Sequence, residues 1–363
     1  MGDLCKSSIF FSDQHLCNAD ILPPPEVRAR IEVSVLNFLR TLSSPTPAIS
    51  DLPLINRKSS NSRVSQGLLT DVSWIFLSRS FCTRSIGQSK VKEFHLIDLL
   101  MSVDPNHVKR SVLIPNVCAL HAFVCQTDVV ALLRCSRFSL GIIASSRGTV
   151  AGRLEPNQEV VDCTACGSSG YAISGDLNLL EKLVLKTDAR YIFVVEKHAI
   201  FQRMAEDRVF NQIPSILITG KGYPDIATRF LLHRLSQAFP KIQILGIVDW
   251  NPAGLAIFCT YKYGSIAMGL EAYRYGAFLY FHHAFQLIFV QLIPEESFAP
   301  LKPRDLQIAK SLTASEILPD KYKEELAVMV ESGHRAEIEA LYYHGYSFLG
   351  KYLANKIVQA CYI

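Results

Sequence analysis

Three apolar runs, each followed by polar residues, decide the fold of this chain. They are Tyr191-Ile192-Phe193-Val194-Val195 before Glu196, Ser215-Ile216-Leu217-Ile218 before Thr219-Gly220, and Ile242 to Val248 before Asp249. The stretches between them, residues 198–207 and 224–239, have helical patterns. Apolar strands that alternate with helices are typical of a parallel sheet covered on both faces. The sequence therefore predicts an α/β domain with a parallel sheet over residues 188–363.

Oxygen-bearing side chains follow two of these strands. Glu196 and Asp249 come directly after their strands, and Asn251 follows two residues later. Ligands bind beyond the carboxyl ends of the strands in such sheets, so we expect the three side chains at one edge. Mg²⁺ prefers oxygen ligands and keeps waters for a phosphate substrate, which predicts a Mg²⁺ site here. The alternative is that these residues only cap the helices that follow.

The loop Thr219-Gly220-Lys221-Gly222-Tyr223-Pro224-Asp225 lies between the second strand and the next helix. Its two glycines allow a close backbone approach, and Pro224 suits the first position of a helix whose N-terminus would attract an anion. The chain has no Walker A pattern of a glycine followed at the required distance by Gly-Lys-Ser/Thr. We therefore expect no ATP site in this chain.

Upstream, the residues after Asp128 predict a helix that ends at Arg134 and Arg137. Residues 138–144 and 149–154 then predict a β-hairpin with Arg147 in its turn. A helix with terminal arginines, followed by a hairpin with an arginine at its tip, is the outline of a winged helix that binds DNA. An ordinary helix and hairpin is an equally good interpretation of this segment.

The rest of the N-terminal half has weaker patterns. Residues 1–65 predict a helix starting at the prolines 23–25, followed by a Ser/Pro-rich linker, and residues 68–81 predict a further core element. We expect domains at 1–65 (extension), 66–155 (winged-helix-like, with 82–126 atypical), 156–187 (connection) and 188–363 (parallel sheet). The overall fold class is α/β, or α+β when the N-terminal half is included.

Composition excludes several classes of protein. The chain has 363 residues, a net charge of +4, 49% hydrophobic and 19% charged residues, so it is neither disordered nor collagen-like. Its ten scattered cysteines favour a reduced intracellular compartment over a disulfide framework. Cys163 and Cys166 lack a second pair of ligands and predict buried thiols instead of a zinc site. The apolar stretch 276–294 contains His282 and His283, so we expect buried core or an irregular insert and no membrane contact.

Tyrosine is distributed unevenly. All 14 tyrosines lie between Tyr171 and Tyr362, and the first 170 residues contain none. The N-terminal half therefore has no phenol to offer as a nucleophile.

Four motifs, in order, closely resemble the Toprim domain of the A-type topoisomerase VI family, and within it the meiotic double-strand-break transesterases of the Spo-eleven group. They are Val194-Val195-Glu196-Lys197, the loop from Thr219 to Asp225, Val248-Asp249-Trp250-Asn251-Pro252-Ala253-Gly254, and Tyr263-Gly264-Ser265. The resemblance implies a DNA-binding winged-helix-like domain followed by a Toprim domain. It also implies DNA cleavage by a dimer in the nucleus, in which a tyrosine of one protomer attacks a phosphodiester beside Mg²⁺ held by the other.

The resemblance also assigns roles to single residues. It implies that Glu196 and Asp249 are metal ligands, with Asn251 at a position that is aspartate in many members, and that Lys221 and Tyr223 contact DNA. The partners it implies are double-stranded DNA, a second A-type chain that is identical or paralogous, and a B-type topoisomerase VI protein that binds ATP.

The chain departs from the family in two sharply bounded blocks, 82–126 and 276–291. The first covers the region where the family carries its nucleophilic tyrosine, and it contains no tyrosine. Such blocks are typical of a retained intron, alternative splicing or a faulty gene model. The leading hypothesis is a DNA-cleaving transesterase whose present form binds metal and DNA but lacks the nucleophile. The alternatives are a non-catalytic protein that binds DNA and dimerises, and a Toprim nuclease that activates water.

Overall fold

The computed structural model describes most of the second half of the chain and short parts of the first. The described residues are 19–42, 52–56, 62–65, 68–72, 75–79, 130, 133–140, 146–157, 162–264, 271–275, 281–283, 292–315 and 318–359. The chain divides into two compact units, one of residues 1–143 with 264–274 and the other of 144–263 with 275–363. The atypical block 82–126 lies outside the described residues.

The first unit contains one long helix and two pairs of strands. Helix α1, Pro24–Leu42, begins within the predicted run of prolines, where a missing N–H costs nothing because the first turn has no acceptor for it. Val27 and Ile31, on one face of α1, are buried. The strand pairs are antiparallel and their bounds are β1, Leu52–Asn56, with β4, Ile75–Arg79, and β2, Ser62–Ser65, with β3, Leu68–Val72.

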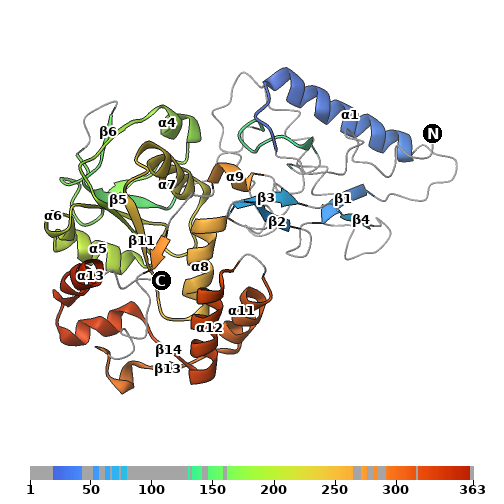
Figure 1. Ribbon diagram of the computed structural model, residues 1–363. Coiled ribbons are helices and arrows are strands. Elements are labelled where there is room, and N and C mark those ends of the chain that lie inside the picture. Colours follow the sequence, from blue (N-terminus) through green and yellow to red (C-terminus); the bar gives the residue numbers. More distant parts are fainter. Residues whose placement is uncertain are drawn as a thin grey trace. The chain divides into compact units, whose positions relative to one another are not determined.

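The second unit is built on a six-stranded sheet (Figure 1) with the order β12-β11-β9-β10-β5-β7. The three predicted parallel strands are confirmed as β9, Tyr191–Val195, β10, Ser215–Thr219, and β11, Gln243–Ile247. β12, Phe281–His283, extends the parallel part beside β11. β5, Thr149–Gly152, is antiparallel to β10, and β7, Tyr171–Ala172, is antiparallel to β5.

Helices cover both faces of this sheet. Right-handed crossovers take the chain from β9 to β10 on one side and from β10 to β11 on the other. They put α5, His198–Glu206, and α7, Ile226–Ala238, on opposite faces, as Figure 1 shows. Because both faces are covered, residues 192–195 of β9 and 216–218 of β10 are almost fully buried. This explains the continuous apolar runs in the sequence.

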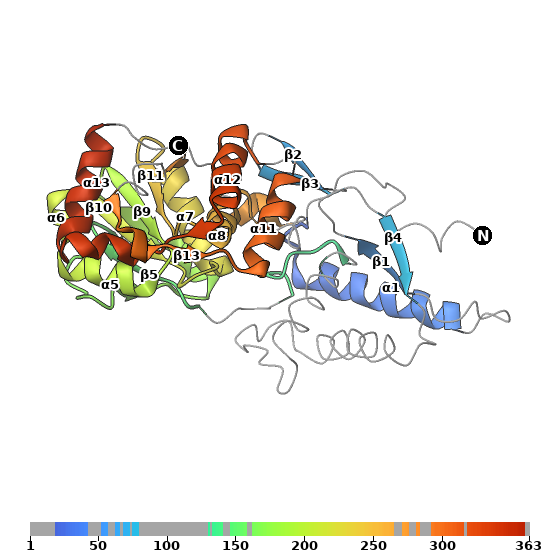
Figure 2. The same cartoon turned by 90° about the horizontal axis from the view of Figure 1, so that it is seen from below.

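The remaining elements of the second unit surround the sheet. Figure 2 shows α11 and α12 near α8 and α13 near α5, in agreement with Figure 1. Their bounds are β6 Glu155–Asn157, α4 Leu177–Lys182, β8 Val184–Lys186, α6 Val209–Gln212, α8 Pro252–Tyr263, η3 Glu295–Ser297, β13 Ala299–Pro300, α11 Pro303–Thr313, α12 Asp320–Ser332, β14 His334–Arg335, η4 Ile338–His344 and α13 Phe348–Val358. A short helix α9, Ala272–Tyr275, lies where the chain returns to this unit.

The predicted hairpin of residues 138–144 and 149–154 is wrong. Residues 137–140 form a turn, and β5 has β10 on one edge and β7 on the other, so it has no free edge for a hairpin partner. The long-range pairing with β10 buries β5 completely, and local turn chemistry cannot reveal such a pairing. The second compact unit accordingly begins at Ala144, before the domain boundaries at 155 and 188 that we predicted. A winged helix further upstream stays a prediction.

Two other expectations concern apolar segments. Residues 281–283 of the block 276–294 form the edge strand β12, in keeping with a segment that belongs to the fold. In the part of the chain that the structure describes, no helix is both long and apolar enough to cross a membrane.

Candidate metal centre

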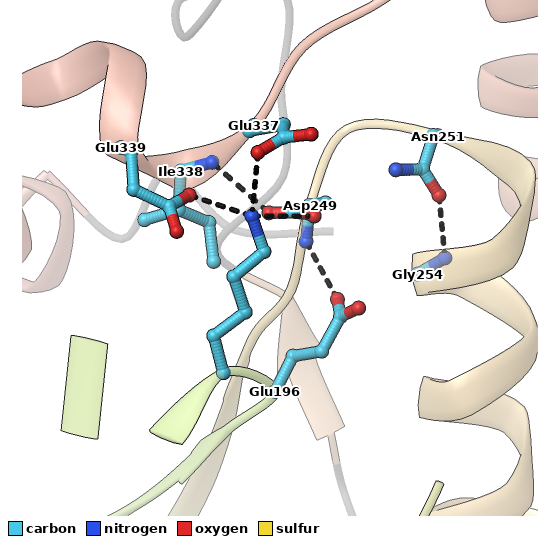
Figure 3. A network of polar contacts seen from close by, with 8 residues as sticks. Glu196, Asp249, Asn251, Gly254, Glu337, Ile338 and Glu339 are labelled. Atoms are coloured by element: carbon cyan, nitrogen blue, oxygen red, sulfur yellow. Dashed lines mark hydrogen bonds and ion pairs between the residues drawn. The ribbon is translucent and has the colours of Figure 1, made fainter. Parts of the chain in front are cut away.

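The two strand-end carboxylates that the sequence singled out lie side by side. β9 and β11 are parallel neighbours with Val195 opposite Ile247, and the N–H of Glu196 donates to the carbonyl of Ile247 at 2.9 Å. The N–H of Asp249 then donates to Oε2 of Glu196 at 2.9 Å (Figure 3). The shared edge follows from the strand register, so the predicted proximity of Glu196 and Asp249 is confirmed.

Asp249 is fixed through both of its carboxylate oxygens. Oδ1 accepts a hydrogen bond of 3.0 Å from the N–H of Ile338, at the start of η4. Oδ2 lies 3.1 Å from Nζ of Lys197. The segment around Ile338 lies 89 residues further along the chain and gave no sequence signal of a role at this edge.

Lys197 also pairs with two carboxylates beyond the predicted site. Its Nζ is 2.9 Å from Oε2 of Glu337 and 2.7 Å from Oε2 of Glu339. Figure 3 shows these carboxylates on one side of the ammonium and Asp249 on another. Our sequence reasoning missed this network. The position of Lys197 directly after Glu196 was the only local signal, and nothing in the sequence paired it with residues 140 positions away.

Burial raises the pKa of both strand-end carboxyls. The pKa of Glu196 rises from 4.5 to about 7, first because the group is buried and second because Asp249 is close. Burial also raises the pKa of Asp249, against the opposing effects of the Ile338 N–H and Lys197. Two buried carboxylates at one edge repel each other, and a divalent cation between them would relieve that repulsion. The donor chemistry thus fits a hard cation such as Mg²⁺.

The same edge would offer a cation few protein ligands. No group of three or more His, Cys, Asp or Glu side chains is arranged to hold a metal among the residues the structure describes. Mg²⁺ tolerates this well, because it is commonly held by one or two carboxylates together with waters and phosphate oxygens.

Asn251 does what the alternative interpretation of the sequence predicted. Its Oδ1 accepts a hydrogen bond of 2.8 Å from the N–H of Gly254 in the first turn of α8. Figure 3 shows this amide directed toward α8, whereas Asp249 is directed toward Lys197. The turn is tight, since a Cβ on Gly254 would lie 2.4 Å from the carbonyl oxygen of Asp249. Asn251 is thus a helix cap beside the carboxylates.

The glycine loop lies next to Glu196. The N–H of Gly222 donates to the carbonyl of Glu196 at 2.9 Å, and Lys221 and Gly222 have φ angles of 57° and 97°. Lys221 is exposed and Tyr223 is 46% exposed. The loop therefore brings a cation and an aromatic ring to the surface near the carboxylates, where we predicted a DNA contact.

The expected anion site at the start of the next helix is not supported. α7 begins at Ile226, so Pro224 is not its first residue, and Asp225 is the N-cap. Its Oδ1 accepts from the N–H of Thr228 at 2.7 Å, and its Oδ2 accepts from the N–H of Arg147 at 2.6 Å. A carboxylate already occupies this helix N-terminus, which disfavours a second anion there.

The three arginines predicted to contact DNA have different surroundings. Arg147 is exposed, but it precedes β5 beside Asp225 and does not lie at the tip of a hairpin. Arg134 and Arg137 are each only 3% exposed. Nη1 of Arg137 lies 3.1 Å from Oε2 of Glu271, and its N–H donates to Oε1 of Glu271 at 2.8 Å. Neither buried arginine is presented for DNA contact in this structure.

The cysteine pair agrees with the expectation of thiols without zinc. Cys163 and Cys166 are free, and the thiol of Cys166 donates to the carbonyl of Asp162 at 3.5 Å. Burial raises the pKa of Cys163 to about 12, which disfavours the thiolate that a metal needs.

Comparisons with known proteins agree with the geometry. Residues 191–357 match the Toprim domain family of Spo11 and the A-type protein of topoisomerase 6, which is a metal-binding domain. The chain is 58% identical to Meiotic recombination protein SPO11-2 of Arabidopsis thaliana, over 99% of this chain and 98% of that relative. It is 34% identical to Meiotic recombination protein SPO11 of Homo sapiens (63% and 59% covered) and 34% identical to the A-type protein of DNA topoisomerase 6 from Arabidopsis thaliana (64% and 55% covered).

Proposed function

The chain belongs to the family of Spo11 and the A-type topoisomerase VI proteins, and on that premise we propose that it is the A-type component of a transesterase that makes meiotic DNA double-strand breaks. The observation that carries this proposal is the contact between Glu196 and Asp249 at the ends of β9 and β11. Two buried, adjacent carboxylates at the edge of a parallel sheet suit metal-assisted phosphoryl chemistry.

Glu196 and Asp249 are the residues that would hold the cation, which we propose to be Mg²⁺. A Mg²⁺ ion bound there would neutralise the charge that develops on the attacked phosphate. The Ile338 N–H fixes the carboxylate of Asp249, and the Asp249 N–H fixes that of Glu196, so neither group has to reorganise during the reaction. Lys221, Tyr223 and Arg147 would contact the DNA near this edge.

This chain would supply the metal half of the reaction and not the nucleophile. Transesterification needs a hydroxyl that can reach the phosphorus, and the first 170 residues contain no tyrosine. The later tyrosines belong to the unit that holds the carboxylates, and several, such as Tyr261 and Tyr275, are almost fully buried. A tyrosine-bearing A-type paralogue would therefore have to supply the attacking group in a mixed dimer.

The proposed partners follow from this division of labour. They are double-stranded DNA, a second A-type chain, either identical or paralogous, and a B-type topoisomerase VI protein that supplies the ATP site, for which this chain has no Walker A motif. Meiotic chromosomes as substrate imply a nuclear protein.

Covalent attachment of protein to 5′ DNA ends tests the proposal. We expect the purified chain with Mg²⁺ and a B-type partner to bind DNA without forming an adduct that survives denaturation. With a tyrosine-bearing A-type paralogue added, we expect an adduct on the paralogue alone, and single-strand nicks because only one tyrosine is present.

The matched control is Glu196→Gln in this chain within the mixed dimer, which should abolish the adduct on the paralogue while leaving dimer formation intact. An adduct that maps to a tyrosine of this chain would contradict the proposal. Free 5′-phosphate ends without any adduct would instead favour a Toprim nuclease that activates water.

A further inference from the structure

Lys197 forms a cationic centre beside the proposed metal ligands. Its ammonium lies 3.1 Å from Oδ2 of Asp249, 2.9 Å from Glu337 and 2.7 Å from Glu339. An ammonium has three N–H donors, and three carboxylates surround this one. The side chain is only 24% exposed, so solvent screens these ion pairs less than it screens pairs on an open surface.

The ammonium competes directly with a metal for Asp249. Oδ1 of Asp249 accepts from the Ile338 N–H and Oδ2 faces Lys197, so each oxygen already has a partner without metal. A cation that binds Oδ2 would lie close to the ammonium, and two positive charges at such a distance repel each other. Glu337 and Glu339 lie on the other side of the ammonium and offer it a place away from Asp249, as Figure 3 shows.

We propose that Lys197 is a built-in counter-cation, which holds Asp249 in the metal-free protein and moves onto Glu337 and Glu339 when a divalent cation binds. The proposal rests on the function proposed above, because it takes Glu196 and Asp249 as the ligands. Lys197 is then a positioning residue. It keeps the carboxylate pair folded without metal, at the expense of metal affinity.

This role reverses the usual effect of a mutation. Removing a structural lysine would disorder the site and weaken metal binding, whereas removing a competing cation strengthens it. Glu337 and Glu339 act in the opposite sense, since they draw the ammonium away from Asp249. Their effect should depend on the presence of Lys197.

Lys197→Met, which keeps most of the aliphatic stem and removes the charge, is the first test. We expect the full-length variant to bind Mg²⁺ roughly tenfold more tightly by calorimetry without DNA. Its metal-free thermal midpoint should fall, and Mg²⁺ should raise that midpoint by more than in the wild type. Lys241→Met, at an exposed lysine before β11, is the matched control and should change neither quantity. Unchanged or weaker Mg²⁺ binding by Lys197→Met would overturn the proposal.

A double-mutant cycle tests the role of the two glutamates. Glu337→Gln with Glu339→Gln should weaken Mg²⁺ binding several-fold in the wild type and have little effect in the Lys197→Met background. Equal weakening in both backgrounds would mean that the glutamates act on the metal directly, which contradicts the proposal. If Lys197→Met does not fold, Lys197→Gln, which keeps an N–H donor toward the glutamates, replaces it in both experiments.

Variants of the ligands separate this inference from the proposed function. If Glu196→Gln and Asp249→Asn bind Mg²⁺ as the wild type does, the proposed metal centre is wrong. If both lose Mg²⁺ while Lys197→Met gains nothing, the metal centre stands and only the role of Lys197 fails.

Discussion

Trp250 and Glu325 are joined by a buried hydrogen bond of 2.7 Å from the indole Nε1–H to Oε1. Trp250 directly follows Asp249, and its backbone exchanges two further hydrogen bonds with Ala336, of 2.9 and 3.0 Å. α12 and the segment before η4 therefore hold the loop that carries the metal ligand from two sides. Sequence similarity alone would draw attention to Asp249, but this anchoring fixes where its carboxylate lies.

We expect Trp250→Phe to lower both stability and metal affinity. The change removes the N–H that Glu325 accepts and leaves a carboxylate that is 9% exposed without this donor, at a cost of about 1–3 kcal/mol. The anchored loop would loosen at the same time, so Mg²⁺ binding should weaken. Urea denaturation and calorimetry measure the two effects. Glu325→Gln, which keeps an acceptor oxygen for the indole, should cost less, and an equal cost would contradict this explanation.

The metal-free protein should lose stability as the pH rises from about 4.5 to about 7. The pKa of Glu196 is about 7 in the folded protein against an ordinary value of 4.5, so the folded state retains this proton over that interval while the unfolded state releases it. The raised pKa of Asp249 acts in the same direction. Denaturation with a chelator at several pH values measures the slope, and Glu196→Gln should make it shallower. Mg²⁺ affinity should increase over the same range.

Asn251 should behave as a helix cap when it is replaced. Asn251→Ala removes the acceptor for the Gly254 N–H and should destabilise the second unit by about 1 kcal/mol. We expect Asn251→Asp to retain the cap and the stability. Thermal unfolding separates the two variants, and Mg²⁺ calorimetry checks for a ligand. If Asn251→Ala lost Mg²⁺ binding as fully as Asp249→Asn, the side chain would be a ligand after all.

The three arginines should separate into one that contacts DNA and two that support the fold. Arg147→Ala should weaken binding to unrelated DNA sequences about equally and reduce the salt slope by about one ion, with little change in stability. Arg137→Ala leaves Glu271 buried without its ion pair and should cost about 3–5 kcal/mol. DNA titrations at several salt concentrations, beside thermal unfolding, distinguish the two. A salt slope unchanged by Arg147→Ala would remove that residue from the interface.

Arg147→Lys is the matched control because it keeps the charge. It should retain most of the DNA affinity and the salt slope of the wild type, since a phosphate contact here depends on charge more than on guanidinium geometry.

The sequence by itself determined the parallel strands, the edge at which Glu196 and Asp249 meet, and the family. Strands buried on both faces must be apolar throughout, and a parallel register must bring their carboxyl ends together, so local patterns were sufficient. Tertiary structure alone decided that β5 pairs with β10 and β7, that Arg137 is buried against Glu271, and that Lys197 meets Glu337 and Glu339. These are contacts between residues far apart in the chain, and no local periodicity encodes them, because each depends on which surfaces remain unpaired after the rest of the sheet has formed.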